Sequence, residues 1–275
     1  MSQSLKYVQE HLDESGPTDV SETFATWAAL VERLKARVSE RFALERDPSS
    51  EALEDFGGET GAKGRVRTYS GPEIDWMVHS HMENAAAGFC NVHLTIWLGP
   101  QVKVPHFGMA LGCFPQGWVY LDSVPRSYLV TDTDSFDRYY EPVNERWEQV
   151  RNENSFLEPF VSRSAFVRAG LSPTAFCYMA PAADEMTSLV TELAEEHLDR
   201  WLGWVDQAET VPVEEQAALA ADDEAIRRNI AERDPANVMG DRYFGAETTQ
   251  QLVRALWGGD RVLPRAHEHE AHRSR

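Results

Sequence analysis

The sequence predicts an α+β fold, a three-layer α/β/α sandwich in which helices cover both faces of a central antiparallel sheet. Between residues 65 and 123, five short apolar or alternating segments follow one another, and the breaks between them are too brief for helical crossovers. Longer segments with apolar residues at helical spacing flank this block on both sides. Together these observations favour a sheet with separate helical layers over a doubly wound parallel sheet.

Residues 1–64 are predicted to form a helix and a mobile linker that pack on the main domain. Between Val20 and Phe42 apolar residues recur at helical spacing, which indicates an amphipathic helix with a charged outer face. Residues 47–64 are rich in Ser, Glu and Gly and have no apolar period, so we expect an exposed linker there.

The main domain is predicted over residues 65–257 and begins with the sheet. Its first strands are expected at Arg65–Tyr69, Ile74–Glu83, Phe89–Leu98, His106–Phe114 and Trp118–Ser123. Residues 132–161 show no regular pattern, and they precede two more predicted strands at Ala165–Ala169 and Ala175–Met179.

The last third of the chain is predicted to be helical up to residue 257. An apolar stripe indicates a helix at Asp184–Val205, a second and more polar helix is predicted at Val213–Glu232, and a third at Ala246–Trp257. Residues 258–275 are charged and have no such stripe, so they are predicted to form a disordered tail. The histidines between His267 and His272 belong to this tail, and a short histidine-rich run is compositional evidence only.

Composition disfavours several classes of function. The net charge of -19 disfavours nucleic acid and anionic membrane surfaces as partners. No apolar run reaches the length of a membrane helix, and residues 1–15 are polar and acidic, so the sequence predicts a cytoplasmic protein without a signal or transit peptide. The three cysteines lie far apart and are expected to be reduced and buried. A monomer and a homodimer are both compatible with the sequence.

The hairpin predicted at residues 74–98 concentrates polar groups. If a five-residue loop closes it, His79 lies opposite His93 and one face carries His79, His81, Glu83, Asn91 and His93. Such groups can hold and deliver protons, because histidine titrates near neutral pH and burial raises the pKa of a carboxyl. This mixture with Met, Phe and Trp is typical of a pocket, and the alternative is a solvated face with incidental histidines.

Three separated segments carry a second line of inference. They read YLDSVPRSYLV from Tyr120, PFVSRSAFVRAGLSPTA from Pro159, and RYFG from Arg242. In this order they resemble the red chlorophyll catabolite reductase family, and the resemblance extends from about Ser70 to Trp257.

The resemblance implies a fold, an activity and a partner. The family is related to the ferredoxin-dependent bilin reductases, in which the tetrapyrrole lies between an antiparallel sheet and the C-terminal helices. These enzymes carry no flavin or metal, since reduced ferredoxin supplies electrons one at a time and protein side chains protonate the substrate radical. The expectation is therefore a cofactor-free reductase of an open-chain tetrapyrrole, either red chlorophyll catabolite or a haem-derived bilin.

The resemblance also implies catalytic roles for three residues. Glu83 looks like the acid at the end of the first hairpin strand, His93 like the histidine of the phycocyanobilin-forming enzymes, and Asp234 like an aspartate of the C-terminal helical region. Asn91 matches an asparagine of the red chlorophyll catabolite reductases. Ala110 departs from the pattern, because the phycocyanobilin-forming enzymes have their central catalytic aspartate there, and this favours a different regiochemistry.

The substrate-binding candidates follow from the charge of the implied substrate. Its two propionates would pair with arginines, for which Arg126 and Arg168 are the candidates, and His79 and His81 are expected to line the pocket. The alternative for Arg168 is an ion pair with an internal carboxylate. The alternative for Asp234 is a turn or helix-capping role.

Docking of ferredoxin on so acidic a chain requires a local basic patch. The candidates for it are Arg126, Arg138, Arg163 and Arg168.

Two rival functions remain at this stage. In the first, His79, His81 and Glu83 hold iron or zinc with His93 opposite them, although the spacing is too short for the usual cupin pattern. In the second, the protein is a non-catalytic tetrapyrrole carrier, which would need the arginines and aromatic walls but no proton donors.

Overall fold

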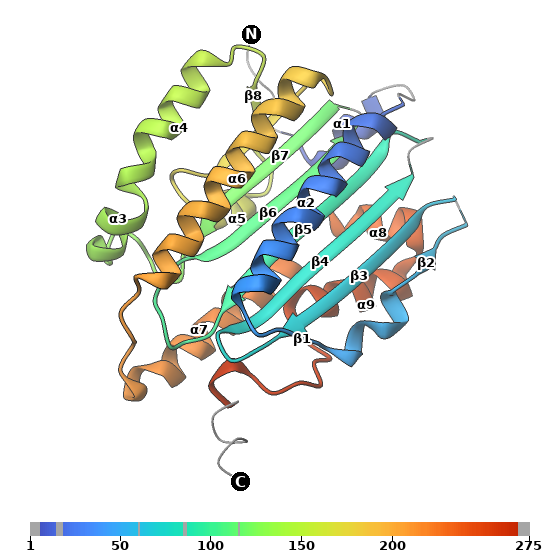
Figure 1. Ribbon diagram of the computed structural model, residues 1–275. Coiled ribbons are helices and arrows are strands. Elements are labelled where there is room, and N and C mark those ends of the chain that lie inside the picture. The colour runs from blue at the N-terminus through green and yellow to red at the C-terminus, as the bar shows by residue number, and fades with distance from the viewer. Residues whose placement is uncertain (1–5, 15–18, 60, 85–86, 115, 269–275) are drawn as a thin grey trace.

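The computed structural model describes residues 6–14, 19–59, 61–84, 87–114 and 116–268, except for the side chains of residues 12 and 14. The predicted α+β sandwich is confirmed, since an antiparallel sheet lies between two layers of helices (Figure 1). In spatial order the strands are β1 (Glu45–Arg46), β3 (Lys63–Ser70), β4 (Ile74–Asn84), β5 (Phe89–Leu98), β6 (His106–Phe114), β7 (Gln116–Val124), β9 (Phe176–Ala180) and β8 (Glu158–Pro159). A further short strand, β2 (Phe56–Gly57), also pairs with β3.

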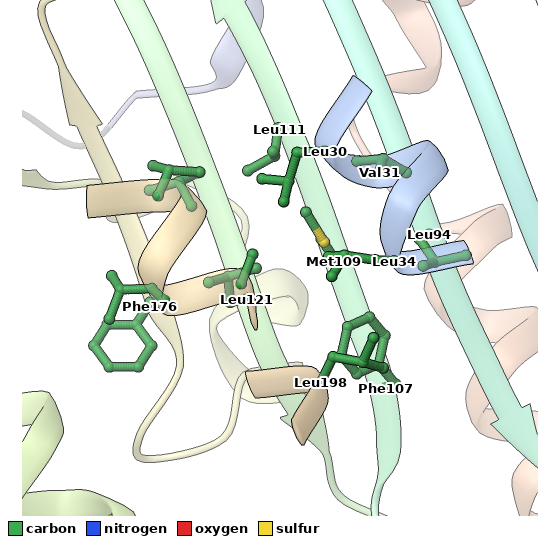
Figure 2. Packing of buried hydrophobic residues seen from close by; sticks show 14 of the residues in the cluster. Leu30, Val31, Leu34, Leu94, Phe107, Met109, Leu111, Leu121, Phe176 and Leu198 are labelled. Atoms are coloured by element: carbon green, nitrogen blue, oxygen red, sulfur yellow. The ribbon is translucent and has the colours of Figure 1, made fainter. Parts of the chain in front are cut away.

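One helical layer forms the larger core with the sheet. It contains α2 (Ser21–Arg41), α3 (Thr133–Tyr139), α4 (Glu141–Glu153) and α6 (Asp184–Asp206). Figure 2 shows Leu30 and Leu34 of α2 beside Met109 and Leu111 of β6. These side chains are buried, and burial of each contributes about 1.5–3 kcal/mol. The apolar stripes that predicted α2 and α6 are therefore the faces that contact the sheet.

The second helical layer covers the opposite face of the sheet. It contains α5 (Ala165–Gly170), α7 (Val213–Glu232), α8 (Asn237–Phe244) and α9 (Ala246–Trp257), with α1 (Val8–Glu14) beside it (Figure 1). A smaller apolar cluster joins this layer to the sheet, with Trp76 and Val78 of β4 against Phe244 and Leu252. This cluster contains fewer buried residues than the larger core on the other face of the sheet.

Two segments expected to be irregular are ordered. The predicted linker contains a 3-10 helix at Pro48–Leu53, where the buried Asp47 accepts a hydrogen bond from the backbone N–H of Ser49. The predicted disordered tail packs on the domain as far as residue 268, because the backbone N–H groups of Val262 and Leu263 also donate to Asp47. Residues 269–275, including the end of the histidine-rich run, lie outside the described residues.

The middle of the chain departs most from the predicted elements. Residues 132–161 contain α3, α4 and β8, and Asp132 starts α3 by accepting a hydrogen bond from the backbone N–H of Ser135. The predicted strand at Ala165–Ala169 is the helix α5, which Ser164 caps through the backbone N–H of Val167. In both places a side-chain cap satisfies a backbone N–H at the start of the helix, and the apolar pattern of the sequence does not indicate such a cap.

A bulge in β4 sets the register of the hairpin. Ile74 pairs with Leu98, but Trp76 pairs with Trp97, so Asp75 is an extra residue and the pairing shifts by one position. From there on Ser80, not His79, lies opposite His93. The predicted register is therefore wrong beyond Ile74, and a shift of one residue moves every side chain of β4 to the other face.

All three cysteines are free thiols. Cys90 and Cys113 are buried as predicted, whereas Cys177 is only partly buried. None of the helices in the described ranges combines the length and the apolar character that crossing a bilayer requires.

Buried histidines make the stability of the fold sensitive to acid. Burial lowers the pKa of His79 and His106 to about 4 and that of His197 to about 3. In the unfolded chain histidine takes up its proton near pH 6.5, so between pH 6.5 and 4 the unfolded chain binds more protons than the folded protein. Stability from this source is therefore present above pH 6.5 and is lost as the pH falls.

We expect the urea midpoint of unfolding to be lower at pH 5 than at pH 7. Each such histidine contributes up to about 1.4 kcal/mol per pH unit in this window. The raised pKa values of Asp122 and Asp234 act in the opposite direction, but the histidines outnumber them. His197→Gln should reduce the difference between the two midpoints. Equal midpoints at pH 5 and pH 7 in the wild type would contradict this account.

Candidate functional site

A cavity of about 310 Å³ lies between the sheet and the second helical layer. Its volume falls within the range of small-molecule sites, about 300–1,000 Å³. The aromatic residues of its wall include Trp97, Phe114, Trp118, Tyr120, Phe160 and Phe166. A wall of this kind suits a large, flat and partly apolar ligand.

One row of paired residues crosses the sheet side of the cavity. His93 on β5 pairs with Ala110 on β6, and Ala110 pairs with Tyr120 on β7. Paired residues of antiparallel strands point to the same face, and all three side chains line the cavity. The next residue of β6 on the same face is Gly108, where an added Cβ would lie 3.1 Å from the hydroxyl oxygen of Tyr120. Small residues on β6 therefore help to keep this wall hollow.

His93 faces the cavity as a neutral imidazole at neutral pH. Burial lowers its pKa to about 4. The neutral ring can donate one hydrogen bond and accept one, but at pH 7 it is not an imidazolium that could give up an extra proton. The prediction that His93 lies in a pocket is therefore supported, while a role as an imidazolium acid would need a bound anion that raises its pKa.

Asp234 lies on the helical side of the cavity, two residues beyond the end of α7. The residue is exposed, but the protein that packs around its carboxyl desolvates this group and raises its pKa. Its Oδ1 atom accepts a hydrogen bond of 2.8 Å from the backbone N–H of Ala236. Asp234 thus has the turn role that was its alternative and also presents a carboxyl to the cavity.

Several buried polar atoms in the cavity wall make no hydrogen bond within the described residues. Asn91 Oδ1, Trp97 Nε1 and Arg227 Nε are buried, and none of them has a hydrogen-bond partner within the described residues. Leaving a buried polar group unpaired costs about 1–3 kcal/mol. A ligand with carbonyl, pyrrole N–H or carboxylate groups would satisfy them.

Arg227 is a wall residue that the sequence prediction missed. It lies on α7, and its Nη1 atom donates to Asp75 Oδ2 over 2.9 Å. The signal was present as a stripe on this helix, since Asp223, Arg227 and Ala231 recur every four residues and Asp234 follows three later. The helix itself was predicted, but no buried face was assigned to it.

Glu83, His79 and His81 lie on the opposite face of the sheet, because the bulge at Asp75 shifts the register. His79 is buried beneath α2, where its Nε2 atom lies 3.8 Å from Glu32 Oε1. His81 packs against Phe24 of the same helix, with ring centroids 4.9 Å apart, and lies 3.6 Å from Glu83. The predicted grouping of all five hairpin residues is wrong, and only Asn91 and His93 line the cavity.

The two predicted substrate-binding arginines have structural roles. Arg126 is buried and pairs with Asp223, and it also donates to the backbone carbonyls of Gly99 and Val104. Arg168 donates from Nη1 to the carbonyl of Ser162 over 2.7 Å, which is neither a cavity contact nor the carboxylate pair that was its alternative. Neither lines the cavity, and Arg126 is too deeply buried to belong to a docking surface.

The four residues of the rival metal site do not come together. His79, His81 and Glu83 lie on one face of β4, and the register places His93 on the other face of the sheet. In the part of the chain that the structure describes, no three His, Cys, Asp or Glu side chains come together as a metal site.

The profile of red chlorophyll catabolite reductase (RCC reductase) matches residues 27–257. The chain belongs to the red chlorophyll catabolite reductase family. Chloroplastic red chlorophyll catabolite reductase of Arabidopsis thaliana is 30% identical over 173 residues, 58% of this chain and 54% of that protein. Phycoerythrobilin:ferredoxin oxidoreductase of a Synechococcus strain is 30% identical over 161 residues, 56% of this chain and 58% of that protein. The matches therefore span little more than half the length of these two relatives.

A solved structure shows the same fold as this red chlorophyll catabolite reductase family member. Phytochromobilin synthase from tomato, in complex with biliverdin, has a TM-score of 0.71 at 14% identity, with 84% of this chain and 82% of that chain covered. Within this chain the family match includes Asn91, His93 and Asp234. It excludes α1, whose Val8 and Gln9 also line the cavity.

Proposed function

We propose that this protein reduces an open-chain tetrapyrrole, either red chlorophyll catabolite or a bilin, with electrons from reduced ferredoxin and with no bound cofactor of its own. The observation that carries the proposal is the grouping of Asn91, His93 and Asp234 around one aromatic cavity in a chain of this family. Reduction of one double bond adds two electrons and two protons. The electrons come one at a time from ferredoxin, and the protons come from side chains of the cavity.

The cavity residues divide into a proton donor and groups that orient the ligand. Asp234, with its raised pKa, is the better acid of the residues first assigned to the site. Asn91 and the neutral His93 hydrogen-bond the polar edge of the tetrapyrrole from the sheet side. Arg227, on α7, attracts the carboxylates or lactam oxygens of the tetrapyrrole.

A tetrapyrrole carrier is the rival that the geometry leaves open. A carrier would use Trp97, Trp118 and Arg227 in the same way. It would have no use for a carboxyl whose surroundings raise its pKa beside the ligand, and this favours the enzyme.

The electron donor requires its own test, because the predicted basic patch is incomplete. Arg126 is buried, and Arg163 pairs with Glu10 over 2.8 Å. Substitution of a small-molecule one-electron reductant for ferredoxin would separate the two parts of the proposal. Activity with the small reductant alone would keep the reductase and remove ferredoxin as its partner.

The test of the function is anaerobic incubation of the protein with reduced ferredoxin and a panel of linear tetrapyrroles that includes red chlorophyll catabolite and biliverdin. We expect the visible absorbance of at least one to change as conjugation is lost, and only when protein and donor are both present. Binding without reduction of any of them would support the carrier instead. Stoichiometric iron or zinc in the purified active protein would overturn the cofactor-free part of the proposal.

A further inference from the structure

The half-buried Tyr120 and the buried Asp122 form a pair on the sheet side of the cavity. Tyr120 lines the cavity, on the far side of Ala110 from His93. Asp122 lies two residues further along β7 and therefore on the same face. The hydroxyl oxygen of Tyr120 is 3.4 Å from Asp122 Oδ2. Asp122 itself does not line the cavity, so its carboxyl reaches the cavity through the phenol.

The carboxyl of Asp122 has no positive partner. Its Oδ2 atom also accepts a hydrogen bond of 3.1 Å from the backbone N–H of Ser172. Among the described residues, no arginine, lysine or histidine side chain forms an ion pair with it, and its Oδ1 atom has no hydrogen-bond partner. Burial raises its pKa to about 6. The group is therefore poised to exchange a proton near neutral pH.

The groups that face Asp122 from neighbouring elements are neutral at that pH. The imidazole of His197 on α6 donates from Nε2 to the backbone carbonyl of Asp122, and burial lowers its pKa to about 3. The thiol of Cys177 on β9 has a pKa raised to about 12, and burial likewise raises the pKa of the phenol of Tyr140, which lies between α3 and α4. Asp122 is thus the group of this cluster that changes charge near pH 6.

A comparison with Asp75 shows that burial alone does not produce this state. Asp75 is also buried, but it pairs with Arg227 and Arg261, which hold its pKa at about 2. A carboxyl needed only for packing would be paired in this way, or replaced by an amide, because an uncompensated buried charge is costly. Asp122 has no such partner, and burial raises its pKa to about 6, so its carboxyl can take up or release a proton near that pH.

We propose that Tyr120 donates a proton to the bound ligand and that Asp122 restores it, so that the cavity has a second proton source on the sheet side, facing Asp234 on the helical side. The proposal rests on the proposed function, and it supplies the second of the two protons. After an electron from ferredoxin has reached the ligand, the O–H bond of Tyr120 breaks and its proton bonds to the ligand radical. The carboxylic acid of Asp122 then transfers its proton to the phenolate oxygen, and solvent reprotonates the carboxylate. Tyr120 is not oxidised.

The test uses Tyr120→Phe and Asp122→Asn, with Tyr140→Phe as the matched control. Tyr140 is a buried tyrosine that donates to the Ser123 carbonyl and does not line the cavity. Asp122→Asn keeps an oxygen for the Ser172 N–H and removes a buried charge, so its urea midpoint should not fall. We expect both cavity variants to slow reduction at least tenfold, since positioned acids contribute about 10²–10⁴-fold. Tyr140→Phe should reduce the ligand at the wild-type rate.

A pH profile separates proton supply from a structural role. The wild-type rate should fall as the pH rises through about 6, because the carboxylic acid form is lost, and Asp122→Asn should lack this transition. Folded variants with the wild-type rate and profile would overturn the proposal.

A second readout does not depend on turnover. The absorbance spectrum of bound biliverdin should change with pH near 6 in the wild type and lose that change in Asp122→Asn. If the protein binds biliverdin but reduces no tetrapyrrole of the panel, the proposed function fails, and this titration still decides whether Asp122 exchanges a proton with the cavity. An identical titration in both proteins would overturn the inference.

Discussion

Asp234→Asn is expected to reduce the rate of ligand reduction by at least about 100-fold, because a positioned general acid contributes about 10²–10⁴-fold. The amide retains an oxygen for the hydrogen bond from the Ala236 N–H, so the turn after α7 should keep its shape. The dissociation constant for the tetrapyrrole should change by less than about threefold, since the carboxyl acts on a proton more than on ground-state binding. Single-turnover absorbance measures the rate, and tryptophan quenching measures the binding.

The matched control for this substitution is Asp241→Asn. Asp241 lies on α8, is exposed and does not line the cavity. The Asp241→Asn variant should therefore reduce the ligand at the wild-type rate. An equal loss in both variants would indicate a general effect on this helical region. An unchanged rate in Asp234→Asn would remove Asp234 from the chemistry.

Asp75→Asn is expected to lower the free energy of unfolding by about 3–5 kcal/mol, the usual cost of removing one partner of a buried ion pair. It would leave Arg227 without its carboxylate in the core and would weaken the contact with Arg261, which donates to Asp75 Oδ2 over 3.1 Å. The asparagine would still accept the hydrogen bond from the Ala266 N–H. Urea denaturation at pH 7 measures the change.

Asp206→Asn is the control for a surface pair. Asp206 pairs with Arg41 over 2.8 Å at the surface, where both side chains are partly exposed, and such pairs contribute less than about 1 kcal/mol. Because the folded-state pKa of Asp75 is about 2, the stability from its pairs is present above about pH 4 and is lost as the pH falls from 4 to 2. Similar losses at Asp75 and Asp206 would contradict the buried network.

The layers and most helices could be predicted because their signals are local. The helices predicted at Val213–Glu232 and Ala246–Trp257 have the same bounds as α7 and α9. The register of the hairpin could not be predicted in this way. It depends on the bulge at Asp75, and the partners that stabilise this residue, Arg227 and Arg261, are 152 and 186 residues away in the sequence.

The candidate site was predicted in part for the same reason. Asn91 and His93 share one strand, so their common face follows from period two whatever the register. The assignment of Glu83 to that face required the register of two strands, and it was wrong by one residue. Arg227 and Asp122 were missed because their roles arise from burial beside distant elements, which a single strand or helix does not reveal.

The dissociation constant of biliverdin for Ala110→Leu, measured beside that for His81→Leu, tests most directly which face of the sheet holds the ligand. Ala110 lines the cavity at the centre of β6, whereas His81 lies on the opposite face beneath α2. The account predicts that the added side chain of Ala110→Leu weakens binding at least tenfold, about 1.4 kcal/mol, and that His81→Leu binds as the wild type does. Unchanged affinity in Ala110→Leu, with weakened binding in His81→Leu, would place the ligand on the other face and contradict the account.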